Sequence, residues 1–242
     1  ALGMSTLQAG AAIANNPAET QQLIELREYE MRLGGNRSLL QTYLKDVLKP
    51  ALLRKGVKEV YLFEETGDDD PKRYHLVIAY PDAATYVAAQ NVRNDEAYRF
   101  ASKAYHEQPA DQPIYTRIQS SLLMAFTGMP AFVAPGADKE LFEIRYYEGY
   151  SEDAVRRKIR MFNREEIDLF YRTGLTPVFF GDMLAGPIRP CLVYMLAFKD
   201  RAERDANWGK FANHPDWNTM KSKPAYADTV STIRRKFLRI VE

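Results

Sequence analysis

The sequence predicts an α+β fold in which one structural unit is built twice. Residues 25–29, Glu-Leu-Arg-Glu-Tyr, return 118 positions later at 143–147 as Glu-Ile-Arg-Tyr-Tyr. At the same offset Gly56 returns as Gly174. A separation of this length is too long for a solenoid repeat. It fits two similar domains within a chain of 242 residues.

The first half predicts the element order β-α-β-β-α-β. Apolar and polar residues alternate over 23–31, which indicates a strand. Ser38 is a suitable N-cap for the next helix, which we expect Pro50 to kink and Gly56 to end. The remaining predicted elements are strands at 57–65 and 74–80, a helix from Pro81-Asp82 to about His106, and a strand within 114–126.

The second half repeats this order. Ser151 is the expected cap of its first helix, and Gly174 is the expected end. The other predicted elements are strands at 141–147, near 178–180 and at 192–198, a helix from about Asp200, and a strand within 229–241. This order is the split βαββαβ unit of the ferredoxin-like fold. The predicted domains are 21–127 and 140–242, joined by a Gly- and Pro-containing linker at 128–139.

Composition excludes several classes of function. The chain has 33 basic and 32 acidic residues, which gives no electrostatic basis for binding nucleic acid. It contains no run of 18 apolar residues, so no transmembrane segment is predicted. A single cysteine, Cys191, and histidines without metal-ligand spacing lead us to predict no metal site. No phosphate-binding, dinucleotide-binding or serine-hydrolase motif is present, so no cofactor is predicted.

Residues 1–20 are interpreted as the remnant of an export signal or as an N-terminal arm. Residues 1–14 are small and uncharged and end in Ala12-Ile13-Ala14, an A-x-A cleavage pattern before polar residues. This pattern favours an exported, periplasmic protein. The alternative is a cytoplasmic protein with a flexible or helical arm.

Six polar and aromatic residues are the candidate ligand-binding residues. They are Glu25, Arg27, Tyr29, Glu143, Arg145 and Tyr147. Strand alternation separates them from the apolar residues of the same two strands. We expect the apolar set to lie under the helices and the six candidates to face the space between the two sheets. There they would form either a pocket for a small polar or anionic ligand or an internal ion-pair network, Glu25 with Arg27 and Glu143 with Arg145.

The repeated segments resemble the opening E-[LI]-R-x-Y of NIPSNAP domains. Residues 202–217, Ala-Glu-Arg-Asp-Ala-Asn-Trp-Gly-Lys-Phe-Ala-Asn-His-Pro-Asp-Trp, are similar to that family's E-R-x-x-x-W-x-x-F-x-x-[DN]-P-x-W segment. The resemblance covers nearly all of 141–242. Residues 22–126 share the layout but lack this segment, and Leu76 and Tyr194 stand where the family tends to carry a histidine.

The resemblance implies a dimeric α/β-barrel, formed here by the two halves of one chain. Relatives of this barrel include monooxygenases, isomerases, dehalogenases and haem-binding enzymes, so the fold does not define a reaction. Our leading hypothesis is a protein of undefined activity that binds a small polar or anionic molecule in a barrel cavity, and whether it is an enzyme stays open. The alternative is a noncatalytic interaction or structural protein with a filled barrel core. The resemblance and the aromatic content also predict a homo-oligomer.

Overall fold

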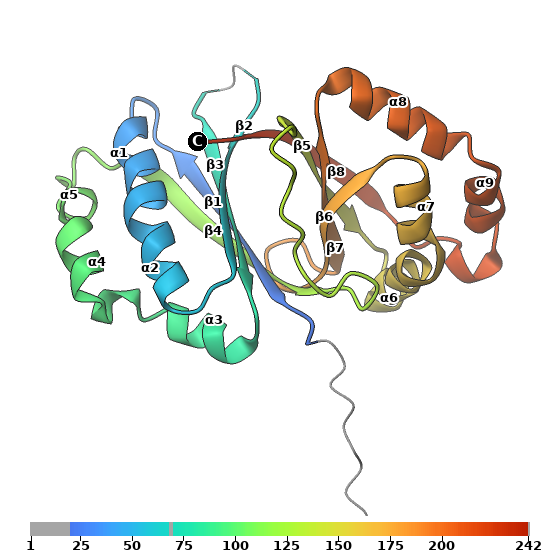
Figure 1. Ribbon diagram of the computed structural model, residues 1–242, viewed down its shortest axis with the longest axis horizontal. Coiled ribbons are helices and arrows are strands. Elements are labelled where there is room, and N and C mark those ends of the chain that lie inside the picture. Colours follow the sequence, from blue (N-terminus) through green and yellow to red (C-terminus); the bar gives the residue numbers. More distant parts are fainter. Residues whose placement is uncertain (1–19, 68–69, 242) are drawn as a thin grey trace, which may run out of the picture.

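A computed structural model describes residues 20–67 and 70–241. Its centre is a closed antiparallel barrel with the strand order β1-β3-β2-β8-β5-β7-β6-β4. The helices of the two halves cover opposite outer sides of this barrel (Figure 1). The predicted α+β class and intrachain barrel are therefore confirmed. The residues that carry the export prediction, 1–14, lie outside the described part of the chain.

The first half has the predicted order with more helical breaks than expected. Its elements are β1 (Leu23–Met31), α1 (Arg37–Thr42), η1 (Tyr43–Leu48), α2 (Lys49–Arg54), β2 (Glu59–Glu65), β3 (Arg73–Tyr80), α3 (Ala83–Ala89), η2 (Val92–Asn94), α4 (Glu96–Ala101), α5 (Lys103–His106) and β4 (Tyr115–Ala125). Asn36 caps α1 by accepting a hydrogen bond from the Leu39 amide, so the prediction that Ser38 is the cap is wrong. Gly56 follows α2 with φ +92°, a conformation that favours glycine at a helix end.

The second half repeats this arrangement with longer helices. Its elements are β5 (Leu141–Glu148), α6 (Glu152–Met161), η3 (Phe162–Glu166), α7 (Ile167–Arg172), β6 (Thr176–Ala185), β7 (Cys191–Phe198), α8 (Arg201–Ala212), α9 (Pro215–Lys221), η4 (Pro224–Tyr226) and β8 (Thr232–Ile240). Ser151 caps α6 as predicted, and Asp200 caps α8. The π-helical segment η3 recurs at the place of η1 although no proline follows it within its helix. A π-helical segment at this place in the fold therefore does not require a proline.

The last strand of each half reaches into the other half. Strand β4 pairs with β1 and also with β6, where Leu122–Ala125 lie opposite Gly181–Ala185. Strand β8 pairs with β5 and also with β2, where Leu238–Ile240 lie opposite Phe63–Glu65. The two halves therefore share one continuous sheet. Neither half can close the barrel alone. Within the described residues, no helix is long and apolar enough to cross a bilayer.

Both faces of the sheet are buried, and this overturns the predicted orientation of the strands. The barrel interior holds the apolar residues of β1 and β5, including Ile24, Leu26, Phe142 and Ile144. Tyr29 belongs instead to the core between the sheet and the helices of the first half. Tyr147 belongs to the corresponding core of the second half. The alternation was predicted correctly, but the two faces were assigned the wrong way round.

Candidate functional site

The candidates of the first half lie beneath helices rather than between the two sheets. The Arg27 Nε and Nη2 atoms donate to Glu25 at 2.9 and 3.1 Å, so the predicted ion pair forms. Glu25 also accepts from the Tyr80 hydroxyl at 2.7 Å and the Ser120 hydroxyl at 2.8 Å. Burial raises the pKa of Glu25, but the Arg27 charge and these hydrogen bonds outweigh it and hold the pKa below its usual value.

Arg27 lines a cavity of about 720 Å³, which we call the first-half pocket. The Arg27 Nη1 atom takes part in neither bond to Glu25. The apolar lining residues include Leu48, Leu52, Ala89 and Val92, and the basic ones include Arg93, Arg99, Lys103 and His106. Glu107 is the single carboxylate among the residues that line it. The pocket therefore combines an apolar wall with an excess of positive charge.

A chain of hydrogen bonds runs along one side of the first-half pocket. The Tyr43 and Tyr98 hydroxyls lie 3.0 Å apart, and the Tyr98 hydroxyl lies 3.1 Å from His106 Nε2. Tyr105 stacks on Tyr43 with ring centroids 3.6 Å apart, which fixes the position of the Tyr43 ring. Burial raises the pKa of Tyr43, so its hydroxyl stays protonated and can donate. The chain links a buried phenol to an exposed imidazole.

The matching carboxylate of the second half is enclosed by side chains of α8. Glu143 accepts from Arg204 Nε at 2.8 Å, Arg204 Nη2 at 3.0 Å and Trp208 Nε1 at 3.0 Å. It also accepts from Arg145 Nη1 at 3.0 Å, which confirms the second predicted ion pair. The pKa of Glu143 is lowered because these partners outweigh the effect of burial. The sequence did not reveal the bond between Trp208 and Glu143.

Trp208 covers Arg145. The Arg145 guanidinium lies 4.4 Å from the centroid of the Trp208 ring, a cation–π contact. The Nε atom of Arg145 is buried and has no hydrogen-bond partner among the described residues. Position 208 is 118 residues after position 90, where Gln90 lines the first-half pocket. Helix α3 ends at Ala89, whereas α8 continues to Ala212. The same place in the fold is thus open in one half and filled in the other.

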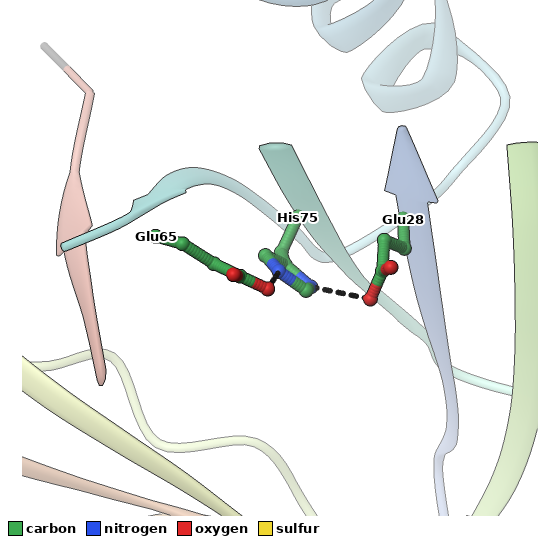
Figure 2. A group of neighbouring side chains, drawn as sticks. All are labelled: Glu28, Glu65 and His75. Carbon is green, nitrogen blue, oxygen red and sulfur yellow. Dashed lines mark hydrogen bonds and ion pairs between the residues drawn. The ribbon is translucent and has the colours of Figure 1, made fainter. Parts of the chain in front are cut away.

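A polar group that the sequence did not predict lies on the opposite, barrel face of β1 and β3. We call it the barrel cluster, and its members are Glu28, Glu30, Glu65, Arg73, His75 and Lys236. Figure 2 shows His75 between Glu65 and Glu28, with Nε2 2.8 Å from Glu65 and Nδ1 3.7 Å from Glu28. Sequence spacing could not reveal it, because its residues come from four strands, β1, β2, β3 and β8.

The second half matches the NIPSNAP family model over residues 142–242. The whole chain is similar in fold to a provisionally named monooxygenase from Lactobacillus acidophilus, with TM-score 0.59, 8% identity, and 91% of this chain and 94% of that chain covered. A provisionally named monooxygenase from Fusobacterium nucleatum gives TM-score 0.58 and 12% identity, with 92% and 94% covered. An anthrone oxidase-like protein gives 0.54 and 8%, with 93% of each chain covered. No curated protein matches the sequence.

Proposed function

We propose that the first half supplies the binding site of this chain. Residues 142–242 match the NIPSNAP family model, and the first half repeats the same order of elements. The ligand is a small organic anion with an apolar body, held in the first-half pocket. The observation that carries this proposal is a cavity of about 720 Å³ with a half-buried arginine in its lining. A volume of this size suits a small molecule.

Charge and shape define the class of ligand. Arg27, Arg93, Arg99 and Lys103 line the pocket against the single carboxylate of Glu107. Arg27 uses Nε and Nη2 on Glu25, so it would offer a ligand carboxylate its Nη1 as a charge-assisted donor, beside the guanidinium groups of Arg93 and Arg99. The apolar wall of leucine and valine would take the hydrocarbon part of the ligand. Aryl and medium-chain carboxylates satisfy both requirements.

The hydrogen-bond chain gives the same pocket a route for moving a proton. Tyr43 would donate to Tyr98, and Tyr98 would donate to His106 Nε2 in the tautomer that leaves this nitrogen as an acceptor. A ligand that gains or loses a proton beside Tyr43 would then exchange it with solvent through the exposed imidazole. This arrangement supports an enzymatic use of the pocket, and binding is the part of the proposal that can be tested without knowing a reaction.

A noncatalytic scaffold role fits the second half better. There the space under α8 contains Trp208, Arg204 and Phe211, and the aromatic core continues through Phe162 and Phe170. A packed aromatic layer of this kind orders the sheet, and Trp208 takes the position at which Gln90 lines the first-half pocket. We therefore assign binding to the first half and support of the barrel to the second.

The test of the proposed function introduces the tryptophan of the second half, Trp208, at the matching position of the first half. Gln90→Trp introduces into the pocket the residue found at the matching position, 208. Isothermal titration calorimetry with benzoate, phenylacetate, indole-3-acetate and octanoate should show saturable binding to the wild type. In Gln90→Trp the affinity should fall by about tenfold or more, because the indole ring occupies the space that the ligand needs.

The matched control is Val87→Trp, which adds the same ring to α3 at an exposed position outside the pocket lining. It should bind the acids as the wild type does. The proposal fails if none of the four acids binds the wild type saturably. It also fails if Gln90→Trp binds them with unchanged affinity.

A further inference from the structure

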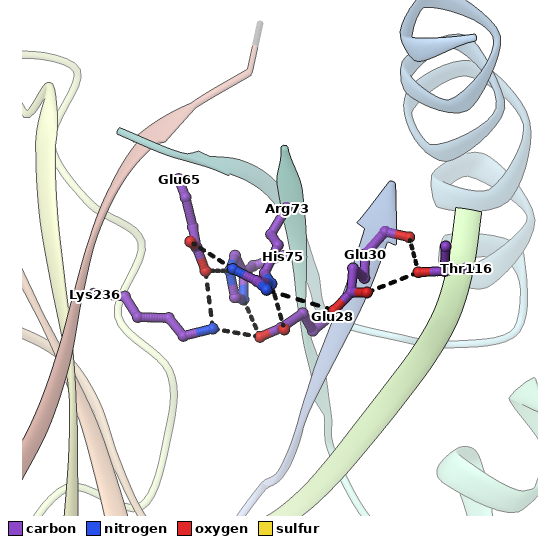
Figure 3. Close-up of polar contacts among 7 residues, drawn as sticks. All are labelled: Glu28, Glu30, Glu65, Arg73, His75, Thr116 and Lys236. Atoms are coloured by element: carbon purple, nitrogen blue, oxygen red, sulfur yellow. Dashed lines mark hydrogen bonds and ion pairs between the residues drawn. The ribbon is translucent and has the colours of Figure 1, made fainter. Parts of the chain in front are cut away.

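The barrel cluster joins the two halves on the face of the sheet opposite the first-half pocket. Lys236 reaches it from β8 and places its Nζ 2.6 Å from Glu28 Oε2 and 2.8 Å from Glu65 Oε1. Arg73 lies 3.5 Å from Glu28 and from Glu30 (Figure 3). His75 is 3% exposed. The cluster borders a cavity of about 270 Å³ lined by Glu28, His75 and Lys236 among others.

The fold does not require charged residues at these places. His75 lies opposite Glu28 in the β1–β3 pairing, and Val193 lies opposite Tyr146 in the matching β5–β7 pairing. Glu65 corresponds in the same way to Met183, 118 positions later. The second half therefore builds its part of the barrel with Tyr, Val and Met where the first half has Glu, His and Glu. A requirement of folding alone would act on both halves.

The cluster also carries more negative than permanent positive charge. Three carboxylates, those of Glu28, Glu30 and Glu65, face the two cations of Arg73 and Lys236. The His75 imidazole lies between two of these carboxylates and is not counted among the permanent charges. Carboxylates taken from water need a compensating cation close by. One further positive charge at this place, a proton or a metal ion, would balance the remaining negative charge.

The donor atoms indicate which cation fits. One oxygen of Glu28, one oxygen of Glu65 and one ring nitrogen of His75 lie within 4.8 Å of one another. A set of one imidazole and two carboxylates suits Zn²⁺ and neighbouring first-row divalent ions, whereas Mg²⁺ and Ca²⁺ prefer oxygen ligands alone. The adjoining cavity gives room for the water that would complete the coordination.

We propose that Glu28, Glu65 and His75 form a binding site for a divalent transition-metal ion, with the Lys236 ammonium as an internal competitor for the two carboxylates. The Lys236 side chain is 30% exposed and sits on a flexible stem, so it can leave the carboxylates when a metal ion arrives. Lys236 belongs to the second half, so occupancy of the site would change a contact that joins the halves.

Two substitutions in the full chain test this proposal in opposite directions. Lys236→Met removes the competing cation and should raise the affinity for Zn²⁺ by about tenfold or more. His75→Val removes the nitrogen ligand and introduces the residue that the second half accepts at the matching position, so the fold should tolerate it. It should abolish saturable binding. Zn²⁺ titration calorimetry and the visible spectrum of Co²⁺ provide the two readouts.

The matched control is Glu64→Gln, which removes a neighbouring carboxylate that pairs with Arg239 and is not part of the cluster. It should leave metal affinity unchanged, and Mg²⁺ and Ca²⁺ should not compete with Zn²⁺. The proposal is overturned if neither the wild type nor Lys236→Met binds Zn²⁺ or Co²⁺ saturably. It is also overturned if binding persists in His75→Val, since the ion would then lie elsewhere.

Discussion

The two halves of this chain keep the same Glu–Arg pair under their helices but surround it differently. In the first half, Glu25 has one cationic partner, and Arg27 borders open volume. In the second half, Glu143 has two cationic partners, and Trp208 covers Arg145. The Glu–Arg pair is therefore compatible with either an open or a filled space between the sheet and the helices. The two halves differ at the matching positions 90 and 208, which hold glutamine and tryptophan.

The largest difference between the halves should appear when each arginine is removed. Arg27→Met leaves Glu25 with only the neutral donors of Tyr80 and Ser120, and breaking a buried pair in this way should cost about 3–5 kcal/mol. Arg145→Met leaves Glu143 paired with Arg204, so the loss should be closer to that of one charged hydrogen bond, about 1.5–3 kcal/mol.

Urea unfolding of the two variants measures this difference. Equal losses in the free energy of unfolding would show that Arg204 does not substitute for Arg145. A smaller loss for Arg27→Met would show that water in the first-half pocket solvates Glu25, and the contrast between the halves would have to be abandoned.

The second prediction concerns the space that Trp208 fills in the second half. Trp208→Gln introduces the residue of the open half and should create a second site beside Arg145. The number of carboxylate ligands bound per chain should rise from one to two. The variant should lose less than the roughly 3–5 kcal/mol typical of a fully buried tryptophan, because Trp208 is partly exposed. A stoichiometry that stays at one would show that Phe211 and Arg204 close the layer without Trp208.

The overall fold was largely predictable from the sequence because its signals are local. Strand β1 was predicted with the observed bounds, since apolar and polar residues alternate over its length. The repeat predicted two similar units, and the resemblance to NIPSNAP domains implied that they form one barrel. The cap of α1 was missed because Asn36 and Ser38 are both good caps, and only the backbone decides between them.

The site was less predictable because both faces of each strand are buried. Alternation separates two sets of side chains but does not say which set faces the helices. Glu143 could be placed only with knowledge of its partners on α8, Arg204 and Trp208, which are more than sixty residues away. The barrel cluster depends on four strands and on Lys236 from the other half. Information of this kind lies in the pairing of distant segments rather than in any local pattern.

The third prediction concerns how the free energy of unfolding depends on pH. It distinguishes carboxyl groups whose pKa is lowered in the folded protein from one whose pKa is raised. The pKa values of Glu25 and Glu143 are lowered in the folded protein, so their stabilising effect is present above the ordinary value of 4.5 and is lost as the pH falls below it. Burial raises the pKa of Glu166, so its contribution changes in the opposite direction. Each lost carboxylate contributes at most about 1.4 kcal/mol per pH unit.

Fluorescence-monitored urea unfolding at a series of pH values gives the test. Glu143→Gln should flatten the decline in the free energy of unfolding below pH 4.5. Glu166→Gln should instead act above pH 4.5, where it removes the gain in stability that protonation of Glu166 gives as the pH falls toward 4.5. If Glu143→Gln leaves the decline unchanged, the pKa of Glu143 is the same in the folded and unfolded chains, and its pairing with Arg145 and Arg204 contributes no pH-dependent stability.

The smallest predicted effect tests where the two halves remain equivalent. Asp82 accepts from the Thr85 amide at 2.7 Å, and Asp200 accepts from the Glu203 amide at 2.8 Å, at the matching helix starts. Each substitution by alanine should cost about 0.5–2 kcal/mol, with similar values because the cap bond is the same. Both losses are measured by urea unfolding against the wild type. A clearly larger loss for Asp200→Ala would mean that the longer helix α8, which carries Arg204 and Trp208 over Glu143, depends more on its cap than α3 does. The closed state of the second half would then rest on its helix as well as on the tryptophan.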